Sequence, residues 1–533
     1  MFQMSYSFDN LLIYLRKHKL LVAISYSLML IGIAVLFLPF RFEENDDVVM
    51  LLLASGNYTG NFESNLVFIN PIYGGLVTFL YKSIKGVEWY TLLFLLFHLL
   101  SLSIVTYKTL NFNIPSFFKG VLLLFFSVVS INFVMYLQFT TVALMLCLSA
   151  ILMILNSNKR ISMFLGVGLI ILSSLIRAEI VLLMLAASIP YLMFTFLKVK
   201  KFKKALFSIL LLIIPLVSIQ LRDEILISNE WKEATKYNRL RAEVTDNINA
   251  DYSSENYKAI CNLADYTLLK NFFIAPEYFN SQKLELLKLK IQGNQTKWSK
   301  LNNIPLQLKS YLKEFIFLGV MLIILFLANP KRKEVYTMLI YGGFLFVLIS
   351  YLSLDGLLKN RVFMGFVLIF VLVMVHNLTQ NLVVKKTYFI SFSILMLVFS
   401  FYYLRRLNEK IQETNQIRNG YLAEQIHFID DFFLKSAESI LIPFGDDLKI
   451  QYLNPFKISS TTDRWRIFYL GWMTNNPYNK KFEKRLKTNF SVFKTIYNSQ
   501  KYSASFKASN YFGNFTVNDS FKSGGFSIQE FKK

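Results

Sequence analysis

Long apolar runs separated by short polar stretches cover most of residues 20–404. A helix needs about 20 such residues to cross roughly 30 Å of hydrocarbon, and its backbone then satisfies its own hydrogen bonds. Eleven runs come close to that length. They lie at residues 20–40, 88–107, 120–136, 138–155, 161–176, 179–197, 205–221, 312–329, 335–353, 361–380 and 387–404. The pattern predicts an all-α polytopic membrane protein with about 11 transmembrane helices.

A further apolar segment, residues 66–81, is interrupted by Asn70, Pro71, Gly74 and Gly75. If it does not cross, one side of the membrane collects 17 Lys and Arg residues, and the short loops of the other side hold 6. If it crosses, every later loop changes side and this asymmetry is lost. Because basic residues concentrate in cytoplasmic loops, we predict an interfacial or re-entrant segment there and a cytoplasmic N-terminus.

This topology divides the chain into a transmembrane helical domain, residues 1–404, and a soluble domain, residues 405–533. The soluble domain and two outer loops, 41–87 and 222–310, are then extracytoplasmic on a multi-pass protein of the cell membrane. The stretch 438–444, with the sequence ESILIPF, is typical of a buried strand, and Gly and Ser punctuate further strands near the C-terminus. We therefore predict a small α/β domain in the tail.

Composition supports a membrane protein and excludes several other classes. Hydrophobic residues make up 54% of the 533 residues and charged residues 17%, and the mean hydropathy is +0.43, so the lipid bilayer is the expected solvent. The formal net charge is +23, but the basic residues gather between apolar runs, and we predict no nucleic-acid partner. The two cysteines form neither a disulfide framework nor a metal-ligand spacing. The sequence has no Walker A loop and no H-E-x-x-H motif, which disfavours an ATP-driven pump and a zinc protease.

Four carboxylates crowd the start of the first outer loop, in the sequence RFEENDDVVM at residues 41–50. Crowding raises the pKa of at least one of them. A carboxylate at the mouth of a helix bundle is suited to take a proton from a hydroxyl or to hold a divalent cation. Asp46 and Asp47 are the leading candidates, with Glu44 beside them. The alternative is a solvated helix start, in which Asn45 caps the helix and the acids favour its N-terminal dipole.

Basic residues lie at the outer ends of two other predicted spans. Lys359 and Arg361 face the same side as the acids, where a guanidinium is suited to grip a lipid-linked phosphate. The alternative is that both side chains snorkel to lipid headgroups. Arg177 and Glu179 lie in the tight turn between two spans and are predicted to pair with each other.

At the acidic cluster the chain resembles the GT-C glycosyltransferases, multi-spanning enzymes that move a sugar from a polyprenyl-phosphate carrier to an acceptor on the outer membrane face. Members of that superfamily place an acidic residue, often a pair, just after the first span, follow it with helices on the membrane, and often end in an outer soluble domain. Asp46 and Asp47, residues 66–81 and the tail match these features. The stretches 44–90 and 463–477 also look like bacterial proteins encoded with surface-polysaccharide genes.

The resemblance implies a GT-C-like fold and an inverting transfer from a polyprenyl-phosphate-linked sugar to a cell-surface glycan or a lipid-linked acceptor. In that hypothesis Asp46 or Asp47 deprotonates or orients the acceptor hydroxyl. Arg361, with Lys359, stabilises the departing lipid phosphate. A divalent cation, Mg²⁺ or Mn²⁺, at the two aspartates is an open alternative, and no other cofactor is predicted.

Two other functions remain open. A repeat-unit polymerase of the O-antigen or capsule type is also multi-spanning and relies on outer-loop arginines. Arg239 and Arg241, in the sequence YNRLR, would then matter more. A non-catalytic transporter or flippase ought to show ionisable residues at mid-bilayer or discontinuous helices in paired halves. The interiors of the predicted spans hold almost none.

Overall fold

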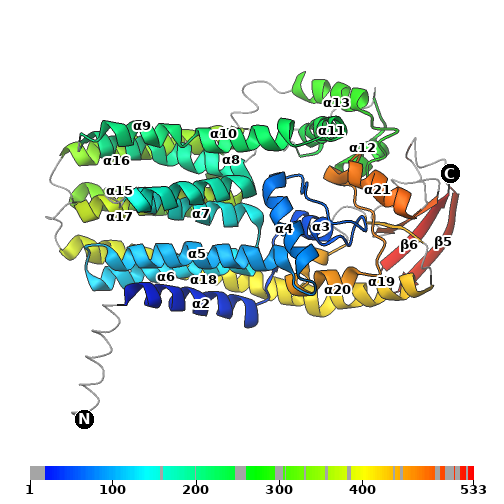
Figure 1. Ribbon diagram of the computed structural model, residues 1–533, viewed down its shortest axis with the longest axis horizontal. Coiled ribbons are helices and arrows are strands. Elements are labelled where there is room, and N and C mark those ends of the chain that lie inside the picture. Colours follow the sequence, from blue (N-terminus) through cyan, green and yellow to red (C-terminus); the bar gives the residue numbers. More distant parts are fainter. Residues whose placement is uncertain are drawn as a thin grey trace, which may run out of the picture.

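The protein is described from a computed structural model in which long helices lie side by side in one bundle and shorter elements gather at one end of it (Figure 1). The residues that it describes are 18–155, 160–198, 200–246, 260–293, 304–305, 308–328, 332–354, 358–380, 386–435, 439–443, 448–486, 492–497, 509, 516–523 and 526–532. All structural statements below concern these residues.

The bundle is built from the apolar runs of the sequence. Its helices are α2 (Lys19–Leu36), α5 (Trp89–Asn111), α6 (Ser116–Met135), α7 (Phe139–Leu155), α8 (Arg160–Lys198), α9 (Phe202–Leu210), α10 (Ile213–Gln220), α15 (Leu312–Ala328), α16 (Arg332–Leu354), α17 (Asn360–Gln380) and α18 (Lys386–Gln416). Eight helical segments among the described residues are long and apolar enough to cross a membrane, and α7 is a shorter apolar helix. Each predicted run overlaps one or two of these helices. The polytopic helical fold is therefore confirmed.

One of these helices holds two of the predicted spans. Helix α8 is 39 residues long, but its backbone leaves helical geometry at Arg177, where φ is −154° and ψ is 88°. The break falls between the predicted spans 161–176 and 179–197. A single predicted span, 205–221, is conversely divided between α9 and α10.

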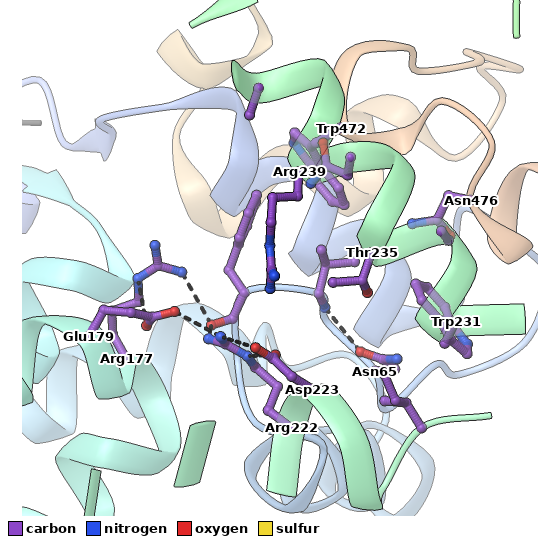
Figure 2. Close-up of a pocket in the computed structure, with 16 residues that line it drawn as sticks. Asn65, Arg177, Glu179, Arg222, Asp223, Trp231, Thr235, Arg239, Trp472 and Asn476 are labelled. Carbon is purple, nitrogen blue, oxygen red and sulfur yellow. Dashed lines mark hydrogen bonds and ion pairs between the residues drawn. The ribbon is translucent and has the colours of Figure 1, made fainter. Parts of the chain in front are cut away.

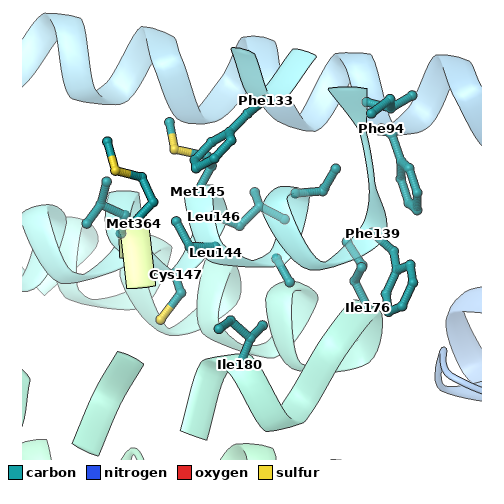
Figure 3. Packing of buried hydrophobic residues seen from close by; sticks show 14 of the residues in the cluster. Phe94, Phe133, Phe139, Leu144, Met145, Leu146, Cys147, Ile176, Ile180 and Met364 are labelled. Carbon is teal, nitrogen blue, oxygen red and sulfur yellow. The ribbon is translucent and has the colours of Figure 1, made fainter. Parts of the chain in front are cut away.

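Helices α7 and α17 form the centre of the bundle. In the apolar window of α17, 89% of the residues are buried, against 28% for α2, whose outer face is left for lipid. Figure 3 shows Leu144 and Cys147 of α7 close to Ile180 of α8 and Met364 of α17 in one apolar cluster. Gly365 permits this approach, because a Cβ at that position would lie 2.6 Å from Leu144 Cδ1.

Two short helices, α3 (Asn45–Ser55) and α4 (Pro71–Ser83), lie at one end of the bundle (Figure 1). Helix α3 stops at Gly56, whose φ of +82° is a left-handed conformation that favours glycine. The side chain of Asn70 caps α4, and a proline occupies the first turn. With 13 residues, α4 is about 20 Å long and too short to cross the hydrocarbon, as predicted for residues 66–81.

A pair of two-residue strands ties the first outer loop to the bundle. Strand β1 (Arg41–Phe42) pairs in parallel with β2 (Tyr136–Leu137), which connects α6 to α7. The backbone N–H of Glu43 also donates to the carbonyl of Leu137 at 3.1 Å. The start of α3 is therefore held against the end of the bundle by backbone hydrogen bonds.

A small helical unit follows α10 at the same end of the bundle (Figure 1). A π-helical turn, Leu221–Ile225, leads into α11 (Asn229–Thr245), α12 (Leu263–Lys270) and α13 (Ser281–Gly293). These helices share an apolar cluster of their own, which includes Tyr237. The unit belongs to the predicted outer loop 222–310.

The C-terminal part is a mixed unit of helices and strands, in agreement with the sequence. Its elements are the π-helical turn Ile417–Leu422, α19 (Ala423–Lys435), β3 (Leu441–Pro443), the 3₁₀ turns Ile450–Tyr452, Pro455–Lys457 and Gly471–Met473, α20 (Ile458–Thr462), α21 (Pro477–Leu486), β4 (Val492–Tyr497), β5 (Thr516–Ser523) and β6 (Phe526–Lys532). The strands form one sheet in the order β3-β4-β6-β5, with β3 and β4 parallel and the other pairs antiparallel. Helix α18 continues through the predicted domain boundary at residue 404, so the unit is joined to the last span by continuous helix.

The C-terminal unit packs on the first outer loop. Tyr58 donates its hydroxyl hydrogen to Asn479 Oδ1 at 2.7 Å. Lys481 Nζ lies 2.9 Å from a carboxylate oxygen of Glu63. These contacts join α21 to the segment after α3, and they bring residues 463–477 to the end of the bundle. The two outer loops and the tail thus gather at one end, while the extracytoplasmic assignment of that end stays a prediction.

Candidate active site

Asp47 is the most deeply buried of the predicted catalytic residues. Its side chain is inaccessible to solvent, and its Oδ1 accepts hydrogen bonds from the Tyr90 hydroxyl at 2.9 Å and from the Phe139 backbone N–H at 3.2 Å. Its Oδ2 has no hydrogen-bond partner among the described residues. Burial raises the pKa of Asp47 well above its usual value of 3.8, because a charged carboxylate loses its hydration there. Asp47 therefore anchors the start of α3 to α5 and α7.

Asp46 is half-buried and lies beside a residue of the C-terminal unit. Its Oδ1 accepts a hydrogen bond from Trp472 Nε1 at 2.8 Å. Burial, with a smaller contribution from the negative charge of Glu44, raises the pKa of Asp46 to about 6. A carboxyl group with that pKa is mostly ionised at neutral pH and is a stronger base than an ordinary aspartate. The predicted solvated helix start does not describe either aspartate, and Asn45 begins α3 instead of capping it.

The two glutamates before α3 pair with the predicted phosphate-binding arginine. Arg361 Nη1, at the start of α17, lies 3.0 Å from Glu44 Oε1 and 3.6 Å from Glu43 Oε2. Burial raises the pKa of Glu43, and the nearby guanidinium opposes that rise. Lys359 is exposed, one residue before α17. The structure thus brings Arg361 to the acidic cluster as predicted, but its charge is already compensated by the two glutamates.

A cavity of about 210 Å³ opens at the same end, between α11, the break in α8 and the C-terminal unit. Its wall includes three guanidinium groups, two carboxylates and two indole rings. The labelled residues of Figure 2, which line it, are Asn65, Arg177, Glu179, Arg222, Asp223, Trp231, Thr235, Arg239, Trp472 and Asn476.

A charged network forms the floor of this cavity. Arg177 Nε lies 3.3 Å from Glu179 Oε2, so the predicted pair is present. Arg222 adds to it, because its Nη2 lies 2.8 Å from Glu179 Oε1 and its Nε lies 2.7 Å from Asp223 Oδ1. Sequence reasoning missed Arg222, although it is the first charged residue after the predicted span 205–221. Opposite charges at these distances stabilise one another more strongly away from bulk water.

Trp472 connects the cavity to the acidic cluster. Its indole lines the cavity, donates to Asp46, and packs edge-on against Phe68 with ring centroids 5.1 Å apart. The positive charge of Arg177 also acts on Asp46 and lowers its pKa slightly. Asp46 is therefore separated from the cavity by a single side chain. The resemblance of residues 463–477 to other bacterial proteins did not indicate a role for Trp472.

The two arginines of the outer loop have different surroundings. Arg239 lines the cavity, and Figure 2 shows its side chain directed into it. Arg241 is buried within its own helical unit, where its guanidinium lies 3.2 Å from Asp246 and 2.8 Å from the Thr245 hydroxyl. Residues that are two positions apart on an α-helix lie about 200° apart around its axis. The side chains of Arg239 and Arg241 therefore point to opposite sides of α11.

The acidic cluster does not assemble a recognisable cation site. Asp46 is directed to Trp472, and Asp47 is directed to Tyr90 and Phe139. Among the described residues, no group of three or more His, Cys, Asp or Glu side chains is arranged to hold a metal ion. The Mg²⁺ or Mn²⁺ alternative at the two aspartates thus stays a prediction without a ligand set.

The fold and site define a polytopic helical membrane protein with a charged, aromatic cavity and a buried acidic pair at one end of the bundle. No protein-family profile matches the chain. No curated protein sequence matches it either. Among solved structures, the chain is similar to the crystal structure of ArnT from Cupriavidus metallidurans bound to undecaprenyl phosphate. The sequence identity is 11% and the TM-score 0.39, over 96% of this chain and 97% of that chain. A similarity at this level assigns neither a family nor an activity.

Proposed function

We propose that the protein is a membrane glycosyltransferase that moves a sugar from a polyprenyl-phosphate carrier to a cell-surface glycan or lipid-linked acceptor on the outer face of the membrane. One observation carries the proposal. Trp472 lines the cavity and at the same time binds Asp46, whose pKa is about 6. A base of suitable strength therefore stands next to a cavity at the end of the bundle where the outer loops and the C-terminal unit gather.

Asp46 is the general base of the proposed reaction. In this scheme the acceptor hydroxyl reaches past the edge of Trp472 to the second carboxylate oxygen of Asp46, which takes its proton, and the hydroxyl oxygen attacks the anomeric carbon of the donor sugar. The bond between that carbon and the phosphate oxygen breaks, and polyprenyl phosphate leaves with the electron pair. The configuration at the anomeric carbon is inverted. Asp46 then releases the proton to water.

The other predicted residues support this step without touching the reacting atoms. Asp47 holds the first turn of α3 through Tyr90 and Phe139. Glu44 shares Arg361 with its neighbouring glutamate, so in this scheme the guanidinium fixes the acidic loop and attracts the lipid phosphate only as part of that network. No step of the reaction is assigned to a divalent cation, because the described acids do not converge on one point.

An Asp46→Asn variant tests the proposal most directly. Asparagine keeps the side-chain shape and an oxygen that accepts from Trp472, but it does not take a proton. In a strain that lacks the native gene, wild-type protein should restore one sugar decoration of the surface glycan, and Asp46→Asn should not. Asp463→Asn, an exposed aspartate of the C-terminal unit, is the control and should behave as wild type. Full decoration with Asp46→Asn at equal membrane levels contradicts the proposed base.

The placement of Arg239 keeps the polymerase as a second candidate function. This outer-loop arginine lines the cavity, as a polymerase that relies on such residues would require. An Arg239→Ala strain that makes short, unpolymerised glycan favours the polymerase, whereas loss of a single sugar favours the transferase. Arg241→Ala does not separate the two functions, because Arg241 holds its own helical unit together.

A further inference from the structure

The charges of the 210 Å³ cavity leave one positive group in excess. Three arginines and two carboxylates line it. Arg177 and Arg222 share Glu179, and Arg222 also pairs with Asp223. Arg239 makes no ion pair or hydrogen bond to another described residue. The floor of the cavity is therefore close to neutral, and the remaining charge is the single guanidinium that enters from α11.

The uncharged polar groups of the cavity are mostly hydrogen-bond donors. Asn65 Oδ1 accepts from the Val67 backbone N–H at 3.2 Å, and Asn476 Oδ1 accepts from the Tyr478 N–H at 2.9 Å. Asn238 Oδ1 likewise accepts from a guanidinium of α11 at 2.9 Å. Each amide thus uses its oxygen within the protein and leaves its NH₂ group for a ligand.

Two fixed indole rings complete the wall. Trp472 is held by its bond to Asp46 and by Phe68. Trp231 is held edge-on by Tyr478, with ring centroids 4.7 Å apart. The rigid apolar face of an indole suits the C–H face of a sugar ring, and the ring pays little conformational entropy on binding because it is already ordered.

Cavity size and position limit the occupant further. The volume of about 210 Å³ is below the range of about 300–1,000 Å³ that is usual for drug-sized ligands, so the cavity suits a ligand as small as one sugar residue. Its wall comes from α11, the break in α8, the π-helical turn after α10, residues 65–68 and the C-terminal unit. In the predicted topology these elements lie on the aqueous outer side of the membrane. One uncompensated guanidinium matches one negative charge, and the bidentate geometry of a guanidinium matches a carboxylate.

We propose that this cavity is the acceptor subsite and that it selects a sugar acid, a single sugar residue whose carboxylate pairs with Arg239. The sugar ring lies against Trp472 or Trp231, and the three amide groups donate to its hydroxyl oxygens. The role of the cavity as an acceptor subsite rests on the proposed function, whereas the binding of a sugar acid rests on the cavity alone. Arg239 is the specificity-determining residue of the subsite.

Binding of sugars to the purified full-length protein in lipid nanodiscs tests the inference without any turnover. The probes are D-glucuronate, D-glucose and D-glucose 1-phosphate, measured by saturation-transfer NMR and by calorimetric titration. We expect D-glucuronate to bind at least tenfold more tightly than D-glucose, and more tightly than the dianionic D-glucose 1-phosphate. Equal binding of glucuronate and glucose, or no binding of glucuronate, overturns the proposal. Preference for the phosphate assigns the cavity to a phosphate and also overturns it.

Two variants assign the effect to Arg239. Arg239→Gln should lose at least tenfold in glucuronate affinity and leave glucose binding unchanged, whereas Arg239→Lys should keep part of the preference. Lys236→Gln is the matched control, because it removes one exposed charge from the same helix outside the cavity. Equal losses in Arg239→Gln and Lys236→Gln contradict a specific pairing. Binding that persists in a protein without transferase activity refutes the proposed function and leaves this inference intact.

Discussion

Replacing Trp472 by phenylalanine removes the N–H that donates to Asp46 Oδ1 at 2.8 Å and keeps an aromatic ring beside the cavity. That hydrogen bond favours the charged carboxylate and lowers the pKa of Asp46, which burial has raised to about 6. A hydrogen bond to a charged group contributes about 1.5–3 kcal/mol, and one pKa unit corresponds to about 1.4 kcal/mol. Because Asp46 is only half-buried and water replaces part of the bond, we expect a rise of about one unit.

The pH dependence of sugar transfer measures this shift. A general base works in its deprotonated form, so the rate falls as the pH drops through the pKa of the base. The midpoint of this fall should lie near pH 6 for the wild type and near pH 7 for Trp472→Phe. The variant should therefore lose about threefold at pH 6.5 and almost nothing at pH 8.5. Membranes that contain equal amounts of each protein are the appropriate samples.

Trp231→Phe is the matched control for this experiment. Trp231 lines the same cavity, and its ring packs against Tyr478 away from the acidic loop. Its replacement should change the affinity for the acceptor and leave the midpoint near pH 6. If Trp472→Phe lowers the rate equally at every pH, the indole is only a wall of the cavity, and the assignment of Asp46 as the base is refuted.

Two further outcomes test the bundle and its orientation. Gly365→Ala places a Cβ 2.6 Å from Leu144 Cδ1, and this overpacking should destabilise the protein by about 1–3 kcal/mol and lower its thermal unfolding midpoint. Gly343→Ala, where nothing lies within 4 Å, is the control, and equal losses in both would contradict the packing. Glu230→Cys, on α11, should react with a membrane-impermeant maleimide in intact cells. Lys203→Cys, in the first turn of α9, which begins at the opposite end of the bundle (Figure 1), should react only after permeabilisation. The two native cysteines are buried, and the reverse labelling pattern would invert the orientation.

The bundle was predictable because the signal for a membrane span is local. A run such as 361–380 has the length and apolar content of a span whatever its neighbours are, and α17 occupies almost the same residues. The interruption at Asn70 left residues 66–81 open as a short span or an interfacial helix, and the distribution of Lys and Arg over the later loops favoured a helix that does not cross. The ends of spans were less predictable, as α18 shows by continuing to Gln416. One of its later turns is tied to β2 by a hydrogen bond of 3.2 Å between the hydroxyls of Thr414 and Tyr136, a contact that a hydropathy pattern does not report.

The partners of the candidate site were not predictable, because they come from distant parts of the chain. Trp472 meets Asp46 across 426 residues of sequence. Arg222 joins Glu179 from a separate helix, and no periodicity connects their positions. Helical spacing predicts that Arg239 and Arg241 point to different sides of a helix, but it does not predict which of the two faces a cavity. That choice depends on where α11 packs.

Asp46 and Asp47 are held in place by two different parts of the protein. Consecutive residues on an α-helix point about 100° apart, so Asp46 and Asp47 face different surroundings. Asp47 is held by Tyr90 and Phe139, which belong to the bundle, whereas Asp46 is held by Trp472, which belongs to the C-terminal unit. The pKa of Asp46 therefore depends on how the C-terminal unit is docked. A change that separates this unit from α3 acts on Asp46 first, while the bundle keeps Asp47 in place.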